Sequence, residues 1–291
     1  MKLQGREESA RAGAARLRQP TAAGLRQASE ATSRFHPVID FHVHPGFSRS
    51  LESQRELIGR VLREARHYGV DRICLSSVAN ASESPTPEQV REGNDSVLRL
   101  VSDYPEAIIG LCFVNPLHAD DALREIDRCF QAGMRGIKLL IACPASDERV
   151  DPIAARAAEL RLPILQHAWY KRDDQKPNES IPANVAALAA RHPKTMIVMA
   201  HLTGCGERGL ADIAPYKNLS VDTSGGEPEA GVTEMAVRKL GPYRVVFGTD
   251  AHGRGYAAAL GKVLGAKLSP RVKALILGGN AARLLSGRLG Q

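Results

Sequence analysis

The chain has 291 residues, of which 43% are hydrophobic and 24% charged, and its net charge is +7. This composition is that of an ordinary globular protein, and it excludes collagenous, low-complexity and wholly disordered chains. No stretch approaches the roughly 18 apolar residues that span a bilayer, and the N-terminus lacks the apolar segment of a secretory signal. We therefore expect a soluble protein without a membrane partner.

The positive charge is concentrated near the N-terminus. Residues 1–36 carry seven Lys or Arg against three Glu, which leaves a net charge of +3 on the remaining 255 residues. Nucleic-acid binding needs a clustered basic face, usually with interleaved aromatic side chains. Aromatic residues make up only 4% of the chain, so we expect no nucleic-acid partner.

Cysteine usage indicates the compartment. The five cysteines are an odd number, contain no CxxC pair and lie partly inside apolar runs. Buried free thiols of this kind are typical of a reducing environment. The sequence therefore predicts a cytoplasmic protein.

Residues 1–36 are rich in Ala, Arg, Ser and Gln and contain almost nothing bulky to bury. Such a segment cannot offset the entropy of ordering its backbone, so we predict a disordered or loosely helical extension ahead of one domain over residues 37–291. Its Arg and Ser content also resembles an organelle transit peptide, but Glu7, Glu8 and Glu30 count against targeting. A misassigned start codon is the alternative explanation.

From Pro37 onward, apolar runs of strand length alternate with longer segments of helical periodicity, which is typical of repeated β/α units and a parallel sheet. The eight runs are 38–44, 71–78, 107–114, 136–141, 163–168, 195–201, 219–225 and 244–250, and helix-like segments between or after them include 57–69, 120–133, 153–161, 185–192, 229–241 and 256–266. Eight units in 255 residues match a closed (β/α)8 barrel, or TIM barrel. No run is followed by the GxGxxG turn of a dinucleotide-binding open sheet, which disfavours a doubly wound fold.

Polar side chains that can bind metal stand at the C-terminal ends of four of these runs. The first run ends in His42 and His44, the fifth in His167, the sixth in His201 and the eighth in Asp250. Active sites of (β/α)8 barrels are built at this rim. We therefore expect the chemistry of the protein there.

An HxH pair alone is a weak metal signal, but four groups at the ends of three strands in one barrel are specific. Strand side chains alternate with a period of two, so we expect Asp40, His42 and His44 on one polar, inward side. Two imidazoles at this spacing can reach one ion at about 2.0–2.1 Å, with His167 and Asp250 completing the site. Asp40, one step deeper, is placed to orient a ligand imidazole by accepting its second ring N–H.

Several motifs together resemble the amidohydrolase superfamily. They are HVHPG at the first run, QHA closing the fifth, AHLTG closing the sixth, VDTSG in the seventh, FGTD in the eighth and LILGGNAARLL near the C-terminus. Within the superfamily they are similar to the amidohydrolase-related (amidohydrolase 2) branch, which includes aminocarboxymuconate-semialdehyde decarboxylase and related aromatic-acid decarboxylases. The resemblance covers roughly residues 37–288 and implies a metal-dependent TIM barrel, but it does not specify a reaction.

The resemblance implies roles for individual residues. His42, His44, His167 and Asp250 match the usual ligands of a single divalent ion, most commonly Zn²⁺, with Mn²⁺ as the alternative. His201 matches the acid/base histidine and, with Asp250, is the expected catalytic group; a second-metal ligand is the alternative for His201. A metal-bound water that titrates near neutral pH needs such a proton carrier beside it.

Other rim residues are candidates for substrate binding. Lys138, in the fourth run, occupies the region where binuclear amidohydrolases hold a carboxylated lysine, but in the resembled branch it is generally not a ligand. We therefore expect it to reach a substrate carboxylate or a neighbouring acid, with a bridge between two ions as the less favoured alternative. Asp222 is a candidate for a substrate contact or a structural hydrogen bond, and Asn115 for a rim contact. Trp169 and Lys171 follow the fifth run and could receive an aromatic or carboxylate-bearing substrate, although a solvated loop is an equal alternative.

The leading functional hypothesis is a metal-dependent hydrolase, in which the ion activates water, His201 manages its proton, and hydroxide attacks an ester, amide or lactone of a small acidic substrate. A non-oxidative, metal-dependent decarboxylase (carboxy-lyase) of an aromatic or unsaturated acid is the alternative, and it uses the same ligands. A catalytically silent barrel that only binds a ligand is the third hypothesis. We expect a small-molecule substrate, and a homodimer is one expectation for the oligomeric state, which the sequence leaves open.

Overall fold

The computed structural model describes residues 36–48, 50–78, 83–226 and 229–287, together with Thr21, Ala23, Gly24 and Gln27. The predicted extension over residues 1–36 therefore lies almost wholly outside the described residues, and so do residues 288–291 of the predicted domain. Within the described ranges, no helix is both long enough and apolar enough to cross a membrane.

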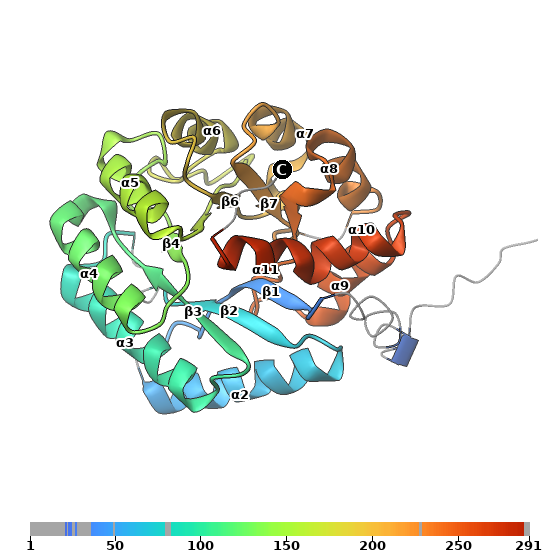
Figure 1. Ribbon diagram of the computed structural model, residues 1–291, viewed down its shortest axis with the longest axis horizontal. Helices are drawn as coiled ribbons and strands as arrows, with labels where there is room; N and C mark the ends of the chain where they lie inside the picture. The colour runs from blue at the N-terminus through green and yellow to red at the C-terminus, as the bar shows by residue number, and fades with distance from the viewer. Residues whose placement is uncertain are drawn as a thin grey trace, which may run out of the picture.

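Eight parallel strands form a nearly closed barrel in which each strand pairs with its neighbour in the chain (Figure 1). They are β1 (Ile39–Val43), β2 (Arg72–Ser76), β3 (Ile108–Phe113), β4 (Ile137–Leu139), β5 (Ile164–Gln166), β6 (Ile197–Met199), β7 (Leu219–Asp222) and β8 (Val245–Val246). Each strand lies inside one of the eight predicted runs, so the predicted (β/α)8 TIM barrel is confirmed. The strands are shorter than the runs because the last residues of each run turn into the loops at the rim.

Helices alternate with the strands and cover the outside of the barrel (Figure 1). They are α2 (Leu51–His67), α3 (Pro87–Asp103), α4 (Ala119–Gln131), α5 (Asp151–Leu160), α6 (Pro182–Arg191), α7 (Leu202–Ile213), α8 (Val232–Leu240), α9 (Tyr256–Leu264), α10 (Pro270–Ala274) and α11 (Asn280–Leu285), with a π-helical turn at Leu275–Gly279 and short 3₁₀ turns at Pro116–His118, Glu148–Val150 and Pro242–Arg244. The apolar faces of the helices pack on the sheet: Ile58 and Leu62 of α2 share one core cluster with Ile73 and Leu75 of β2.

A separate apolar cluster fills the inside of the barrel. It joins Phe41 of β1 to Leu165 of β5, on the far side of the barrel, and to Leu284 of α11. Gly278, just before α11, lies so close to the start of β1 that an added Cβ would sit 1.8 Å from the Pro37 carbonyl oxygen. The C-terminal helix therefore closes the N-terminal end of the barrel and leaves the opposite rim for polar groups.

The side chains of β1 do not alternate as the sequence predicts. The pairing of β1 with β2 shifts by one residue between Asp40 and Val43, which is a β-bulge. Phe41 joins the inner apolar cluster, and the Asp40 carboxylate faces Thr249. The expectation that Asp40 lies on the same side as His42 is therefore wrong, because the bulge reverses the alternation between them.

Backbone hydrogen bonds close the seam between β8 and β1 at the rim. The Asp250 N–H donates to the His42 carbonyl at 2.8 Å, and the His44 N–H donates to the Ala251 carbonyl at 2.8 Å. These bonds bring Asp250 beside the HxH pair although the residues are about 200 positions apart in the chain. The position of the predicted ligands is thus set by closure of the barrel.

Asp40 reinforces this seam from below. Its carboxylate accepts hydrogen bonds from the Thr249 N–H at 3.0 Å, the Thr249 hydroxyl at 2.6 Å and the His42 N–H at 3.1 Å. Burial raises the pKa of Asp40 to about 7, and the hydrogen bonds from Thr249 and His42 oppose that shift. The predicted contact with a ligand imidazole ring is replaced by contacts that hold the strand carrying Asp250 against β1.

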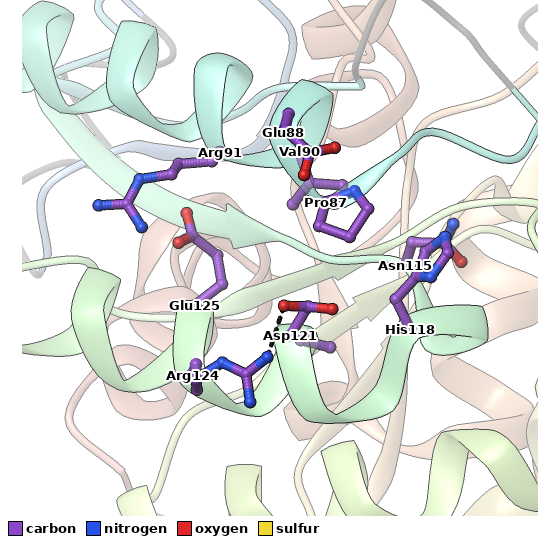
Figure 2. Close-up of a pocket in the computed structure, with 10 residues that line it drawn as sticks. Pro87, Glu88, Val90, Arg91, Asn115, His118, Asp121, Arg124 and Glu125 are labelled. Atoms are coloured by element: carbon purple, nitrogen blue, oxygen red, sulfur yellow. Dashed lines mark hydrogen bonds and ion pairs between the residues drawn. The ribbon is translucent and has the colours of Figure 1, made fainter.

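Asn115 lies away from the polar mouth, against the prediction of a substrate contact. Its amide donates to the Pro85 carbonyl at 2.8 Å, and its side-chain oxygen accepts from the Leu117 N–H at 2.9 Å. It lines a separate cavity of about 210 Å³ between α3 and α4 (Figure 2), together with Arg91 and His118. Both polar ends of Asn115 are therefore used to shape the loops around β3.

We expect Asp40→Ala to lower the free energy of unfolding by about 1–3 kcal/mol, because the buried Thr249 N–H and hydroxyl lose their acceptor. Urea denaturation of the metal-free protein measures this change. Asp103→Ala, which removes an ion pair with Arg55 on the surface, serves as the control and should change stability far less. Equal effects of the two substitutions would contradict the assigned role of Asp40.

Candidate metal centre

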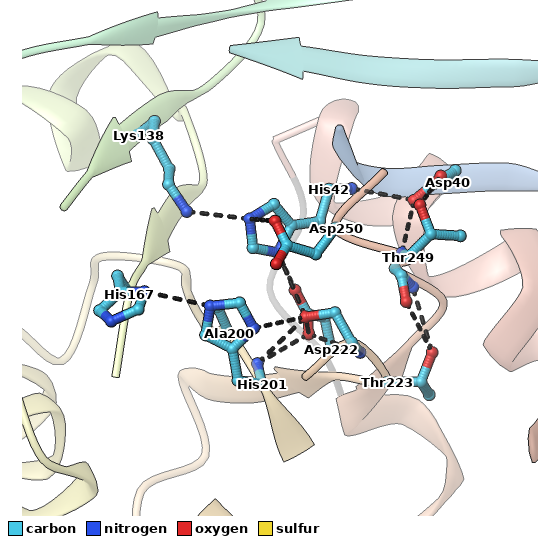
Figure 3. Close-up of polar contacts among 12 residues, drawn as sticks. Asp40, His42, Lys138, His167, Ala200, His201, Asp222, Thr223, Thr249 and Asp250 are labelled. Atoms are coloured by element: carbon cyan, nitrogen blue, oxygen red, sulfur yellow. Dashed lines mark hydrogen bonds and ion pairs between the residues drawn. The ribbon is translucent and has the colours of Figure 1, made fainter. Parts of the chain in front are cut away.

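Three predicted ligands, His42, His44 and Asp250, converge at the C-terminal rim of the barrel. Figure 3 shows His42 and Asp250 of this group beside each other. The Nε2 atoms of His42 and His44 are 3.0 Å apart, and the Asp250 Oδ1 lies 3.6 Å from each of them. His42 lies in β1, His44 is the first residue after β1, and Asp250 follows β8. The barrel therefore brings two imidazoles and a carboxylate to one point.

The hydrogen bonds of the two rings fix which nitrogens face that point. The His42 Nδ1 lies 2.8 Å from the Asp222 Oδ2, and the His44 Nδ1 lies 2.9 Å from the Ser76 carbonyl oxygen. Because both partners accept, we assign the proton of each ring to Nδ1. Burial lowers the pKa of both rings well below the ordinary value, so they are neutral and each Nε2 presents a lone pair.

A divalent cation fits this set of donors. Two atoms bound at about 2.1 Å to one ion, at an angle of about 90–120°, are separated by about 3.0–3.6 Å. The separations among His42, His44 and Asp250 fall in this range. In the structure the Lys138 ammonium, 3.0 Å from the His42 Nε2, supplies positive charge at this point, and a bound cation would supply more to the two lone pairs and the carboxylate oxygen. His42, His44 and Asp250 therefore form a candidate site for a divalent metal.

Asp222 lies beneath this site and does not face the cavity. It is fully buried; its Oδ2 contacts the His42 ring, and its Oδ1 accepts from the backbone N–H of His201 at 2.9 Å and from the Ser224 hydroxyl at 2.5 Å. These contacts are those that the structural alternative for Asp222 expects, and its substrate-binding alternative stays a prediction. Asp222 takes the ring-orienting role that the sequence assigns to Asp40.

His201 is held over the same network. Its Nδ1 lies 2.9 Å from the Ser224 Oγ, and the Trp169 ring lies against its own ring with centroids 4.8 Å apart. Since the Ser224 hydroxyl donates to Asp222, it accepts from the His201 Nδ1–H, and the His201 Nε2 lone pair faces the cavity. Sequence reasoning missed Ser224, although it stands two residues after Asp222 in VDTSG.

The backbone at two of these positions is strained. His201 has φ 73° and Asp250 has φ 62°, and both residues stand where a strand ends. A left-handed conformation costs a residue other than glycine about 1–3 kcal/mol and is concentrated at functional sites. Both of these left-handed residues are ones that the sequence predicts to be catalytic.

The ligand atoms of His42, His201 and Asp222 also lie within 4.8 Å of one another. The Ser224 Oγ lies 2.9 Å from the His201 Nδ1 and 3.3 Å from the His42 Nδ1, so a hydrogen-bond network fills the space between them. This second group therefore orients the rings. The second-metal alternative for His201 stays a prediction, because its Nε2 lies on the other side of the ring, 3.0 Å from the His167 Nδ1.

His167 lies beside His201 instead of beside the HxH pair. Its Nδ1 is 3.0 Å from the His201 Nε2, and its Nε2 is 2.7 Å from the Glu179 Oε1. Among the described residues, His167 belongs to neither group of converging ligand atoms. Its role as a fourth ligand stays a prediction. Burial alone would raise the pKa of Glu179, but hydrogen bonds from His167 and Lys171 lower it to about 2.

Lys138 of β4 reaches the centre from the opposite side. Its side chain is fully buried and its Nζ lies 3.0 Å from the His42 Nε2. Burial lowers the pKa of Lys138 to about 8, whereas the carboxylates of Asp250 and Asp222 act in the other direction. The ammonium therefore points at the nitrogen that a metal would use, and it needs another acceptor when a metal binds there.

The centre opens into a cavity of about 340 Å³. The side chains that line it are His42, His44, Phe47, Val78, Lys138, Leu140, Ile141, His167, Trp169, Lys171, Lys176, Glu179, His201 and Asp250. Trp169 and Lys171 line the cavity, and their role in substrate binding stays a prediction. However, the Lys171 Nζ is 2.8 Å from the Glu179 Oε2, so its charge is already paired.

Comparison with family models identifies the chain. The family model described as amidohydrolase, of the amidohydrolase 2 type, matches residues 39–287. The chain belongs to the amidohydrolase family. This finding confirms the resemblance inferred from the motifs, and it makes the protein an enzyme of the amidohydrolase superfamily. No curated protein matches the chain significantly.

Solved structures share the fold of this amidohydrolase at low sequence identity. The 5-carboxyvanillate decarboxylase from Sphingomonas paucimobilis is 21% identical, with a TM-score of 0.70 over 86% of this chain and 99% of the other. The 2,6-dihydroxybenzoate decarboxylase from Rhizobium is 17% identical, with a TM-score of 0.69 over 86% of this chain and 98% of the other. A dihydroxybenzoic acid decarboxylase from Polaromonas, solved with bound manganese, is 17% identical, with a TM-score of 0.69 over 86% and 97%.

We expect the purified amidohydrolase to hold about one equivalent of divalent metal per chain, and His42→Ala, His44→Ala and Asp250→Ala to lose it. Elemental analysis gives the stoichiometry, and metal added at 100 times its Kd should stabilise the wild type by about 2.7 kcal/mol. His192→Ala is a matched control, since His192 pairs with Asp151 away from the centre. A wild type that holds no metal and gains no thermal stability from zinc or manganese would contradict the assignment.

Proposed function

We propose that this amidohydrolase is a metal-dependent carboxy-lyase that removes carbon dioxide, without oxidation, from a small aromatic or unsaturated acid. The observation that carries the proposal is the ammonium of Lys138, buried in the cavity beside the candidate metal ligands. A buried cation needs an anionic partner. A substrate carboxylate placed between Lys138 and the metal would supply it.

The other lysines that line the cavity support this choice. Lys171 is paired with Glu179, and Lys176 with Glu83, at the outer edge of the cavity. Among the described residues, Lys138 forms a hydrogen bond with an uncharged imidazole nitrogen, and the carboxylates of Asp250 and Asp222 act on its charge without forming an ion pair with it. Of these three lysines, Lys138 is therefore the one with which a substrate carboxylate would form the most favourable ion pair.

The named activities of proteins with the same fold are compatible with such a substrate. The solved structures compared above are decarboxylases of dihydroxybenzoate and 5-carboxyvanillate. Phe47, Val78, Ile141 and Trp169 give this cavity an apolar wall that suits the flat body of such an acid. We therefore rank decarboxylation above the hydrolysis that the sequence alone favours.

The residues can be assigned to the steps of this reaction. The bond between the carboxylate and its carbon breaks, its electron pair stays on that carbon, carbon dioxide leaves, and the carbon takes a proton. Lys138 would hold the carboxylate and, as a proton-bearing group in the cavity, supply that proton. Trp169 and Phe47 would exclude water and orient the substrate.

A divalent ion held by His42, His44 and Asp250 would supply positive charge to stabilise a developing anion on the substrate. We propose Zn²⁺ as this ion, because two neutral imidazoles and a carboxylate are typical zinc ligands. Mn²⁺ is the alternative, since the decarboxylase from Polaromonas was solved with manganese.

Hydrolysis of an acidic ester, amide or lactone is the second candidate function. The observation that favours it concerns His201. Its Nδ1–H donates a hydrogen bond to the Ser224 Oγ, so the lone pair of its Nε2 faces the cavity. A proton acceptor at this position could take a proton from an attacking water. The two candidates therefore differ in which residue carries the reaction: Lys138 as donor or His201 as acceptor.

We expect the enzyme reconstituted with Zn²⁺ or Mn²⁺ to release carbon dioxide from hydroxybenzoate-like acids. Lys138→Met should retain the metal but lower kcat/KM about 10- to 100-fold, because a charged hydrogen bond worth about 1.5–3 kcal/mol is lost. Carbon dioxide release and elemental analysis measure the two properties.

Lys176→Met is the matched control, since this lysine lines the same cavity but is paired with Glu83. Acid release from lactones or esters, with no carbon dioxide from any acid tested and unchanged activity in Lys138→Met, would reject the lyase and favour the hydrolase.

A further inference from the structure

The loop that begins at Trp169 packs into the side of the cavity, and the proposed function assigns no role to its buried carboxylate. Residues 169–181, here called the strap, connect the end of β5 to α6 and carry Glu179. The Glu179 side chain is only 1% exposed although it stands on an irregular segment. A carboxylate is rarely buried this deeply unless its oxygens are satisfied by several donors.

Glu179 is satisfied on both oxygens. Its Oε1 lies 2.7 Å from the His167 Nε2, and its Oε2 lies 2.8 Å from the Lys171 Nζ and 3.1 Å from the Gln175 Nε2. The backbone N–H of Lys176 also donates to Oε2, at 3.4 Å. The donors on Oε2 come from the strap itself, so the carboxylate cannot rotate away from His167 without breaking the strap.

The contact with Glu179 decides which nitrogen of His167 is available. A carboxylate accepts, so the His167 Nε2 must carry the proton that it donates. The His167 Nδ1 is then the atom with a lone pair, and it points toward His201, 3.0 Å from that ring's Nε2. If Glu179 were absent, His167 could exchange tautomers or turn its ring, because its Nε2 would have no fixed partner.

We infer that Glu179 is a positioning residue that fixes His167 with Nε2 protonated and Nδ1 directed toward His201 in the cavity, and that it couples the strap to this ring. It follows that, if His167 binds a metal, it does so through Nδ1. The inference rests on the geometry of the centre and is independent of whether the enzyme is a lyase or a hydrolase. Outer partners of this kind typically contribute 10- to 100-fold to metal affinity.

The test is histidine tautomer analysis by NMR of full-length protein labelled with ¹⁵N-histidine, first metal-free and then with Zn²⁺. His167→Gln identifies the resonances of His167. We expect the Nε2-protonated form in the wild type, the same form in Glu179→Gln, whose amide oxygen can still accept, and a mixture of tautomers or a charged ring in Glu179→Ala.

Metal titration gives the second readout on the same proteins. Glu179→Ala should bind Zn²⁺ about 10- to 100-fold more weakly, and Glu179→Gln should lose less. Glu83→Gln is the matched control, since Glu83 pairs with Lys176 of the same strap at its exposed side, and it should match the wild type. An unchanged His167 tautomer in Glu179→Ala overturns the inference whatever the metal affinity, and so does an equal loss of affinity in Glu83→Gln.

Discussion

The centre depends on one electrostatic constraint: lone pairs that point at each other need a cation between them. His42 and His44 each give their Nδ1 proton to an acceptor of the protein, so their Nε2 atoms face one another at 3.0 Å, with a carboxylate oxygen of Asp250 3.6 Å away. Burial in the barrel makes this arrangement favourable for a bound cation, and in the free protein the Lys138 ammonium, 3.0 Å from the His42 Nε2, supplies part of the positive charge. Asp222 keeps the lone pair of His42 directed inward, and the Ser76 carbonyl does the same for His44.

Barrel closure is what allows distant residues to meet this constraint. Asp250 is brought to the HxH pair by backbone bonds between the end of β8 and β1, and Asp40 holds the same seam through Thr249. The C-terminal helix fills the other end of the barrel with apolar side chains. The stability of the fold and the geometry of the site are therefore linked at one seam, where Asp250 also adopts a left-handed backbone.

The fold and the main site residues could be predicted from the sequence because their signals are local. The eight apolar runs, and the His and Asp residues at the ends of four of them, can be recognised in the sequence itself, and all eight strands lie inside those runs. Asp40 could not be placed, because a β-bulge leaves no mark on the period-two pattern. Ser224 and Glu179 were missed for a different reason: their roles arise from hydrogen bonds to histidines on other β/α units, which spacing along the chain does not encode.

X-ray absorption of the metal-loaded protein tests the central claim most directly, because it reports the atoms around the ion without requiring a known substrate. The account predicts nitrogen and oxygen neighbours at about 2.0–2.1 Å from Zn²⁺, with the outer-shell pattern of at least two imidazoles. Sulfur neighbours, or oxygen neighbours without any imidazole, would contradict it by placing the metal away from His42 and His44.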